Sequence, residues 1–360
     1  MPRLVILFLT SLAVWSLVPG TDLAYGYETV TFRDGEEEQT VVAKIMVEAQ
    51  DGGLMLCAED GHIWTLQPEQ ILSRESNDQP LVPITDDEME RRLLAELGDG
   101  FSIYRTQHYV VAYNSSEAYA RQVAAMYEQL YRGFFTYWKN QYWKLPEPEY
   151  PLVSVVLRNH DAFLKYATKD IGETANTVIG YYHLASNRMI TFNVPDFERN
   201  VSTIIHEATH QLAYNCGLQA RFADNPLWVS EGLATFFEAP DRRNPTRWRN
   251  IGRVNQVNLL RWRRYAPNRP AESLATLLAD DQRFRSPASA ASAYAECWAL
   301  TYFLIKTRRK EYVEYLRTLS KGRPLAEKSQ KERIELFEQA FDTTLAELDK
   351  DFVTFLRRVR

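Results

Sequence analysis

The sequence has little cysteine, no excess of one charge, and no long apolar run beyond its first twenty or so residues. Three cysteines in 360 residues are too few for a fold built on disulfides. The 42 basic and 47 acidic side chains nearly balance, so overall charge gives no reason to expect a nucleic-acid or membrane partner. Apolar residues make up 45% of the chain, which excludes disorder, and the length suggests roughly two or three domains.

Residues 1–26 have the pattern of a secretory signal peptide. Arg3 precedes an apolar stretch from Leu4 to Val18, whose length of about fifteen residues falls short of the roughly 20 that span a bilayer. An uncleaved membrane anchor is the alternative. We expect an exported protein, periplasmic, on the cell surface or secreted, with no stable membrane span once the signal is removed.

Residues 27–73 predict a small β domain, either barrel-like or a curled sheet. Short apolar runs alternate with Asp-Gly dipeptides, which favour tight turns because glycine adopts positive φ without steric cost. No group of catalytic residues occurs there, so a structural or docking role is the simplest interpretation. The runs are Thr29–Phe32, Val41–Val47, Leu54–Cys57 and Ile63–Leu66, and the dipeptides are Asp34-Gly35, Asp51-Gly52 and Asp60-Gly61.

The rest of the chain mixes strand and helix patterns, which makes the expected fold class α+β. Asn114 and Glu117 suggest the cap of a helix with apolar residues at helical spacing. Strands are expected at Tyr104–Tyr113, Val153–Leu157 and Arg188–Phe192, with mostly amphipathic helix after Ser292. The expected divisions are a linker over 74–100 with a short helix near Met89–Leu97, an α+β core over 101–240, and a helical C-terminal part over 241–360.

The densest chemical pattern lies in residues 199–217, RNVSTIIHEATHQLAYNCG. Apolar residues at helical spacing, with Gly217 after them, predict a helix. His206 and His210 would lie one turn apart on it, so both imidazoles can bind one metal ion. Glu207 would project beside them, where a carboxylate can take a proton from metal-bound water. This is the H-E-x-x-H pattern of zinc peptidases, and two unconnected histidines on a helix are the alternative.

A third ligand has to come from another element, because one helical turn supplies only two. Residues 224–238 read DNPLWVSEGLATFFE and place Glu231 21 positions after His210. A carboxylate from a following helix would complete the ligand set and leave the fourth position open for water.

These segments together resemble the gluzincin metallopeptidases, the thermolysin-like and aminopeptidase-like clan. The chain is more similar to DUF1570, an uncharacterised branch of the peptidase MA-like superfamily, over about residues 100–320. The resemblance implies a thermolysin-like catalytic domain with one catalytic Zn²⁺, ligands His206, His210 and Glu231, and Glu207 as general base. The segments that carry it are GYYHLASNRMITFN, HEATHQLAYNCG, RFADNPLWVSEGLATFFE and SAYAECWALTYFL.

The resemblance also implies a donor to the oxyanion. Tyr294, 63 positions after Glu231, corresponds to the tyrosine of the aminopeptidase-like enzymes. A tyrosine packed in a helix is the alternative, and His183 is a second candidate donor.

Other residues near the motif have open roles. Asp224 and Glu238 are candidates for orienting a ligand imidazole, while Thr235 stands where a thermolysin-like chain carries aspartate. Cys216 and Cys297 could form a disulfide if their helices flank one site, since an exported protein can hold one.

Two features bear on the substrate. Aminopeptidases of the clan hold the substrate's free amine with a glutamate, but residues 180–193 contain no acid. This favours an endopeptidase, with Arg188–Phe192 as an edge strand that pairs with an extended peptide. Nine arginines, with Trp248 and Trp262, occur in residues 242–269. Contact with an anionic polymer or acidic peptide and a salt-bridged structural loop are alternatives there, and no nucleic-acid partner is expected.

The sequence therefore predicts an exported zinc metallopeptidase with a peptide or protein substrate. The alternatives are a non-catalytic binding protein of the cell envelope on the same scaffold, and a zinc amidase that acts on a non-peptide or cell-wall amide. The oligomeric state is not indicated by the sequence.

Overall fold

The structure of the protein is a computed structural model that describes residues 26–194, 197–239 and 251–360. The signal-peptide prediction, apart from Gly26, lies outside the described residues, as does part of the arginine-rich segment. None of the described helices is both long enough and apolar enough to cross a bilayer.

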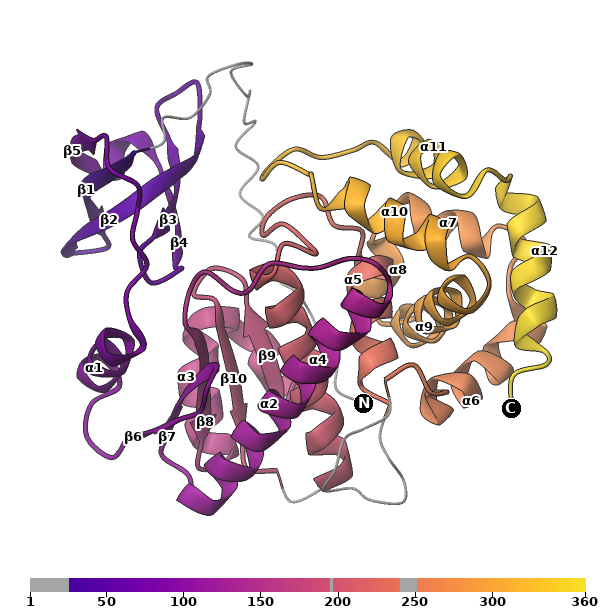
Figure 1. The fold of residues 1–360 in the computed structure, drawn as a ribbon, viewed down its shortest axis with the longest axis horizontal. Coiled ribbons are helices and arrows are strands. Elements are labelled where there is room, and N and C mark those ends of the chain that lie inside the picture. Colours follow the sequence, from indigo (N-terminus) through magenta and orange to yellow (C-terminus); the bar gives the residue numbers. More distant parts are fainter. Residues whose placement is uncertain (1–25, 195–196, 240–250) are drawn as a thin grey trace.

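The N-terminal part of the chain forms a five-stranded antiparallel sheet in the order β4-β3-β2-β1-β5 (Figure 1). Four strands occur where the sequence predicts them, and Gly35, Gly52 and Gly61 have positive φ in the turns. The fifth strand extends into the expected linker and was missed because its sequence, ILSRESN, is mostly polar and exposed. β4 and β5 are the two edges of the described pairings, so the sheet is open rather than a closed barrel. The strands are β1 (Tyr27–Asp34), β2 (Glu37–Glu48), β3 (Leu54–Ala58), β4 (Ile63–Leu66) and β5 (Ile71–Asn77), with a 3-10 helix at Pro68–Gln70.

The second sheet is mixed and has the order β6-β7-β8-β10-β9. β7, β8 and β10 are parallel, while β6 and β9 are antiparallel strands at the two edges. The single strand expected at Tyr104–Tyr113 is a hairpin, because the chain turns between Thr106 and Tyr109. Its strands are β6 (Ser102–Arg105), β7 (Tyr109–Tyr113), β8 (Leu152–Leu157), β9 (Gly180–His183) and β10 (Arg188–Phe192).

Helices cover both faces of the second sheet. α1 (Asp86–Leu97) and α3 (His160–Ile171) pack on one face, and α2 (Glu117–Asn140) and α4 (Phe197–Asn215) on the other. This explains why every residue of β8 is buried, since both of its faces are covered. A 3-10 helix, Gly172–Thr177, follows α3. The predicted cap of α2 is wrong: Ser116 accepts from Tyr119 N, while Asn114 accepts from Arg158 N.

The remaining helices form the C-terminal part, on the far side of α4 from the N-terminal sheet in Figure 1. Glu296 of α9 is fully buried and accepts from Arg269 Nε at 2.7 Å and Arg283 Nη2 at 2.8 Å. Arg269, the last residue of the arginine-rich segment, is therefore a structural ion-pair partner, and Trp262 is buried as well. The helices are α5 (Leu227–Phe237), α6 (Gln256–Tyr265), α7 (Ser273–Ala279), α8 (Gln282–Arg285), α9 (Ala290–Thr307), α10 (Arg309–Leu319), α11 (Gln330–Phe341) and α12 (Leu345–Leu356), with a 3-10 helix at Ala266–Asn268.

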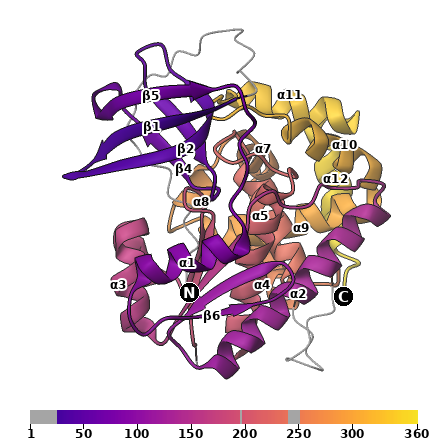
Figure 2. The same ribbon diagram turned by 60° about the vertical axis from the view of Figure 1, so that its left-hand side comes forward.

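The N-terminal sheet packs against the second unit near the β9–β10 turn. Ile63 N donates to Ala185 O at 2.8 Å. Arg221, in the connection between α4 and α5, donates through Nη1 to Gly61 O at 2.7 Å and to Leu184 O at 3.3 Å. The two sheets are thus joined by backbone and guanidinium hydrogen bonds, and α1 leads from the first sheet to β6 (Figure 2).

Candidate metal centre

The candidate site is built on two buried helices. α4 carries His206, Glu207 and His210, all of which are buried. α5 is buried along its whole length, as expected of a helix that is apolar almost all round. Glu231 interrupts that apolar surface at 1% exposure. A carboxylate in such a place is costly unless it is paired or holds a metal ion.

Gly232 allows α5 to lie close to α9. A Cβ atom at this position would meet Thr301 Oγ1 at 2.1 Å and Cys297 O at 3.1 Å. Any side chain there would push the helices apart. The glycine therefore sets the separation of the helix that bears Glu231 from the helix that bears Tyr294.

The three expected ligand residues come together. Glu231 Oε2 lies 3.1 Å from His206 Nε2, and Glu231 Oε1 lies 3.7 Å from His210 Nε2. One ligand atom from each residue lies within 4.8 Å of the other two. Zinc bonds of 2.0–2.1 Å in tetrahedral geometry place neighbouring ligand atoms about 3.3 Å apart. His210 Nε2 is buried without a hydrogen-bond partner, so the donor set fits a metal ion.

The charges of the cluster point to the same conclusion. Burial alone would lower the pKa of His206, but the Glu231 and Glu238 carboxylates raise it well above its usual value. Burial lowers the pKa of His210 to about 4. Burial would raise the pKa of Glu231, yet the neighbouring histidines and the Tyr294 hydroxyl lower it. The His206 ring thus lies between two carboxylates, whose negative charge favours a cation in the cluster.

Glu238 is the residue that orients His206. Its Oε2 lies 2.7 Å from His206 Nδ1, and its Oε1 accepts from Asn255 Nδ2 at 3.0 Å. An imidazole ligand commonly donates its second N–H to a carboxylate, which fixes the ring and its tautomer. Of the two residues considered for this role from the sequence, Glu238 is the one next to the cluster.

Glu207 lies between the cluster and the second sheet. Its Oε2 accepts from Tyr182 N of β9 at 2.8 Å, while its Oε1 is buried without a partner. Burial raises the pKa of Glu207 to about 8. Gly180 keeps β9 this close to α4, because a Cβ there would meet Thr203 Cγ2 at 3.1 Å. One carboxyl oxygen is therefore fixed and the other is available.

Tyr294 is brought from α9 to the same place. Burial and the Glu231 carboxylate, which the hydroxyl contacts, raise its pKa well above the usual value. Its ring packs edge-on against Phe284 at 5.3 Å between centroids. The structure thus joins Tyr294 to the three expected ligands and Glu207.

His183 does not join the cluster. It lies on the face of the second sheet that packs on α3, where its Nδ1 lies 2.9 Å from Ser186 Oγ and 3.9 Å from Asp170 Oδ2. The neighbouring Tyr182 faces α4 instead, because successive side chains of a strand point to opposite faces. The prediction that Arg188–Phe192 is an edge strand is also wrong, since β10 lies between β8 and β9 and the edge is β9.

The structure also tests the roles expected for Asp224, for Thr235 and for the cysteines. Asp224 forms ion pairs with Arg333 and Lys328, so it takes no part in the cluster. Thr235 Oγ1 donates to Glu231 O at 2.7 Å, a hydrogen bond to the backbone of its own helix. The cysteines are all free and buried, which excludes the disulfide considered between Cys216 and Cys297.

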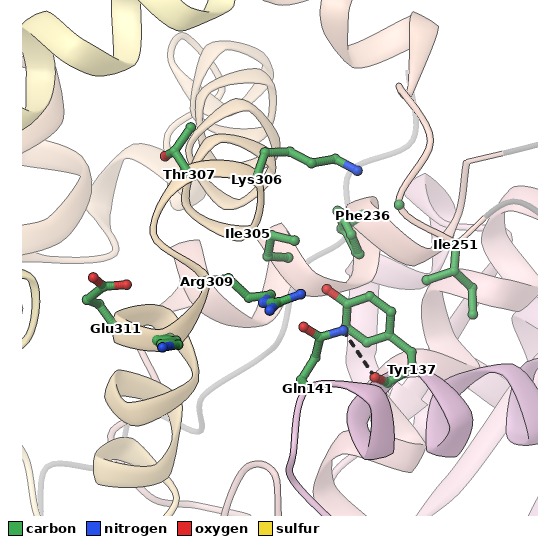
Figure 3. A pocket seen from close by; sticks show the side chains of 11 residues that line it. Tyr137, Gln141, Phe236, Ile251, Ile305, Lys306, Thr307, Arg309 and Glu311 are labelled. Atoms are coloured by element: carbon green, nitrogen blue, oxygen red, sulfur yellow. Dashed lines mark hydrogen bonds between the residues drawn. The ribbon is translucent and has the colours of Figure 1, made fainter.

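A cavity of about 590 Å³ lies elsewhere, where α2, α5 and the α9–α10 junction meet (Figure 3). Tyr137, Phe236 and Ile251 form one side, and Lys306 and Arg309 reach over it from the other. No residue of the cluster lines this cavity. It is therefore distinct from the candidate metal centre.

Sequence reasoning missed two contributors. Asn255 lies 17 residues beyond Glu238, and no motif marks it. A helix-cap preference for asparagine was the one available signal, and it says nothing of the metal centre. Tyr182 contributes its backbone N–H, which carries no sequence signal at all.

Part of the chain is similar to a protein family of unknown function. Residues 200–326 match the model of DUF1570, described as a protein of unknown function. That range includes both histidines, Glu207, Glu231, Glu238, Asn255 and Tyr294. No curated protein matches the chain. The expected similarity to DUF1570 is confirmed over this range, and it carries no information about activity.

Proposed function

We propose that this protein is an exported zinc metallopeptidase that cleaves peptide bonds within its substrates. One arrangement carries the proposal: His206, His210 and Glu231 share a common point while an unpartnered carboxyl oxygen of Glu207 lies in the same cluster. Two histidines and a carboxylate are the ligand set of a catalytic zinc site, because they leave the fourth position of the ion open for water.

Bound zinc would act as a Lewis acid and lower the pKa of a water in the open position to about 7. The positive charge of a bound metal ion would lower the raised pKa of Glu207, so that its Oε1 could take the proton from that water and later give it to the leaving amine nitrogen. Tyr182 N holds Oε2, so Oε1 is the oxygen left for proton transfer. Glu238 would hold the His206 ring by accepting from its Nδ1–H.

The Tyr294 hydroxyl, in contact with Glu231, would donate to the carbonyl oxygen of the substrate as negative charge develops on it. β9 is the edge strand beside Glu207, and an extended peptide can pair with such an edge. The absence of an acid in residues 180–193 supports internal cleavage over removal of N-terminal residues.

The test uses the purified full chain with zinc. Wild-type protein is expected to hold one zinc ion per chain and to cleave denatured casein, with loss of cleavage in a chelator. Glu207→Gln is expected to keep the zinc and lose activity by about 100-fold or more. Glu335→Gln, a substitution on the exposed surface of α11, is the matched control and keeps full activity. Wild-type turnover in Glu207→Gln would overturn the mechanism.

The alternatives give different results in the same assay. A binding protein would hold zinc without cleaving casein or cell-wall fragments. A zinc amidase would cleave amides of purified cell wall in a Glu207-dependent manner and leave casein intact. Export is tested separately: cell fractionation should recover the protein outside the cytoplasm, with an N-terminus generated near residue 26.

A further inference from the structure

The side chain of Asn255 makes two kinds of contact, one through its oxygen and one through its nitrogen. Its Oδ1 accepts from Asn258 N at 3.2 Å, which caps the N-terminus of α6. Its Nδ2 donates to Glu238 Oε1 at 3.0 Å and to Thr235 O at 3.2 Å. The residue is 2% exposed, so water does not compete for these bonds.

We propose that Asn255 is a positioning residue for the metal centre, acting on His206 through Glu238. This inference rests on the proposed function. Glu238 is the C-cap residue that follows α5, and its carboxylate is held at both oxygens, one by His206 and one by Asn255. A carboxylate held at two oxygens has a fixed plane, whereas one held at a single oxygen can rotate. Asn255 thereby keeps Oε2 aligned with His206 Nδ1.

The cap and the positioning role can be separated because they use different atoms. Serine and aspartate are as good as asparagine at an N-cap, since each supplies an acceptor oxygen. Aspartate has no N–H to donate to Glu238 and places a second carboxylate against it. The serine hydroxyl lies one bond closer to the backbone than the amide nitrogen, so the oxygen that caps α6 is expected not to reach Glu238 as well. Asn255→Ser therefore removes the contact with Glu238 and retains the cap, while Asn255→Asp also adds repulsion.

Asn159 offers a matched control. It caps α3 through Oδ1, which accepts from Ala162 N at 3.0 Å, and lies far from the cluster on the opposite face of the second sheet. Asn159→Ser repeats the same substitution at a cap without a carboxylate partner of the metal centre. Any effect of losing asparagine at a helix cap as such appears in both variants.

The experiment is a titration of the metal-free full chain with Co²⁺ against a competing chelator, followed by the visible absorption of bound Co²⁺. Asn255→Ser is expected to bind about 10-fold more weakly than wild type, and Asn255→Asp more weakly still. The absorption bands should also shift in position, which a loss of stability alone would not produce. Asn159→Ser should match wild type in affinity and spectrum. Without metal, Asn255→Ser should have a lower urea midpoint than Asn159→Ser, because Glu238 Oε1 and Thr235 O lose a buried donor.

The outcomes distinguish a failure of the positioning role of Asn255 from a failure of the proposed metal centre. If wild type binds Co²⁺ and Asn255→Ser binds it with the same affinity and the same spectrum, the positioning role is overturned and the proposed function stays intact. Absence of Co²⁺ and Zn²⁺ binding by the wild-type chain overturns the metal centre and this inference together. Equal weakening in Asn255→Ser and Asn159→Ser assigns the effect to capping and also overturns the inference.

Discussion

His206 Nδ1 lies 2.7 Å from Glu238 Oε2, although 32 residues separate them in the chain. The contact turns His206 Nε2 toward Glu231, and thus toward the place where the ligand atoms of His206, His210 and Glu231 come together. A carboxylate behind an imidazole ligand raises its basicity and fixes its orientation. The geometry of the centre is therefore decided partly by residues that do not belong to the H-E-x-x-H motif.

Glu238→Gln is expected to weaken zinc binding by about 10- to 100-fold. The amide loses the negative charge, and its NH₂ group would face either His206 Nδ1–H or Asn255 Nδ2, both donors. Competition with a chromogenic chelator measures the affinity. Asp224→Asn is the contrasting variant, since it weakens the largely buried pair with Arg333 and should lower stability without changing zinc affinity. Equal zinc affinity in Glu238→Gln and wild type would contradict the role of Glu238.

Tyr294→Phe is expected to lower kcat by about 100-fold while zinc content and KM stay close to wild type. The hydroxyl would act on charge that develops only during the reaction, so its loss affects turnover rather than binding. Tyr302→Phe, on the same helix and stacked on Trp298, is the matched control. A kcat unchanged in Tyr294→Phe would leave the tyrosine as a packing residue.

Acidification is expected to weaken the fold through His62. Burial lowers the pKa of His62 to about 4 in the folded protein, against about 6.5 when unfolded. Between these values the unfolded chain takes up a proton that the folded chain does not, so the free energy of unfolding falls as the pH falls. The loss is up to about 1.4 kcal/mol per pH unit, and none occurs above about pH 7.

His62→Gln removes this contribution. Urea unfolding at pH 7.5 and at pH 4.5 should show a smaller loss of stability for the variant than for wild type. The same loss in both proteins would show that His62 does not titrate in this window. The residue stacks on Trp64 at 4.3 Å between centroids, so the variant is compared with wild type at each pH rather than across pH alone.

Gly232→Ala is expected to destabilise the protein by about 1–3 kcal/mol, because its Cβ would overlap Thr301 Oγ1. Urea unfolding measures the change. Adding Thr301→Ala removes the overlapping atom but leaves Thr301 Cβ, at 3.2 Å, so the double variant should recover part of the loss. Independent, additive effects of the two substitutions would show that the overlap with Thr301 is not the cause of the loss.

The sequence predicts the cluster better than its surroundings. His206, Glu207 and His210 are fixed by local helical geometry, and Glu231 follows from the need for a third ligand. The edge strand could not be assigned, because β9 and β10 are both short and apolar and only pairing decides which lies outside. β5 was missed for the opposite reason: its polar residues are tolerated by an exposed strand whose hydrogen bonds come from β1. Asn255 was missed because its contact with Glu238 depends on the path of the chain between α5 and α6, which no sequence pattern predicts.

Arg221 has a consequence for shortened forms of the protein. Arg221 is 9% exposed, and its guanidinium donates to Gly61 O in the β3–β4 turn of the N-terminal sheet. A chain that began at residue 101 would leave this charge without that acceptor, and it would uncover the apolar surface around Tyr150 that Met55 and Cys57 now cover. Buried charges that lose a partner are strongly destabilising. Expression of residues 101–360 alone is therefore expected to give poorly soluble protein. A shortened form that keeps its function should include residues 26–100.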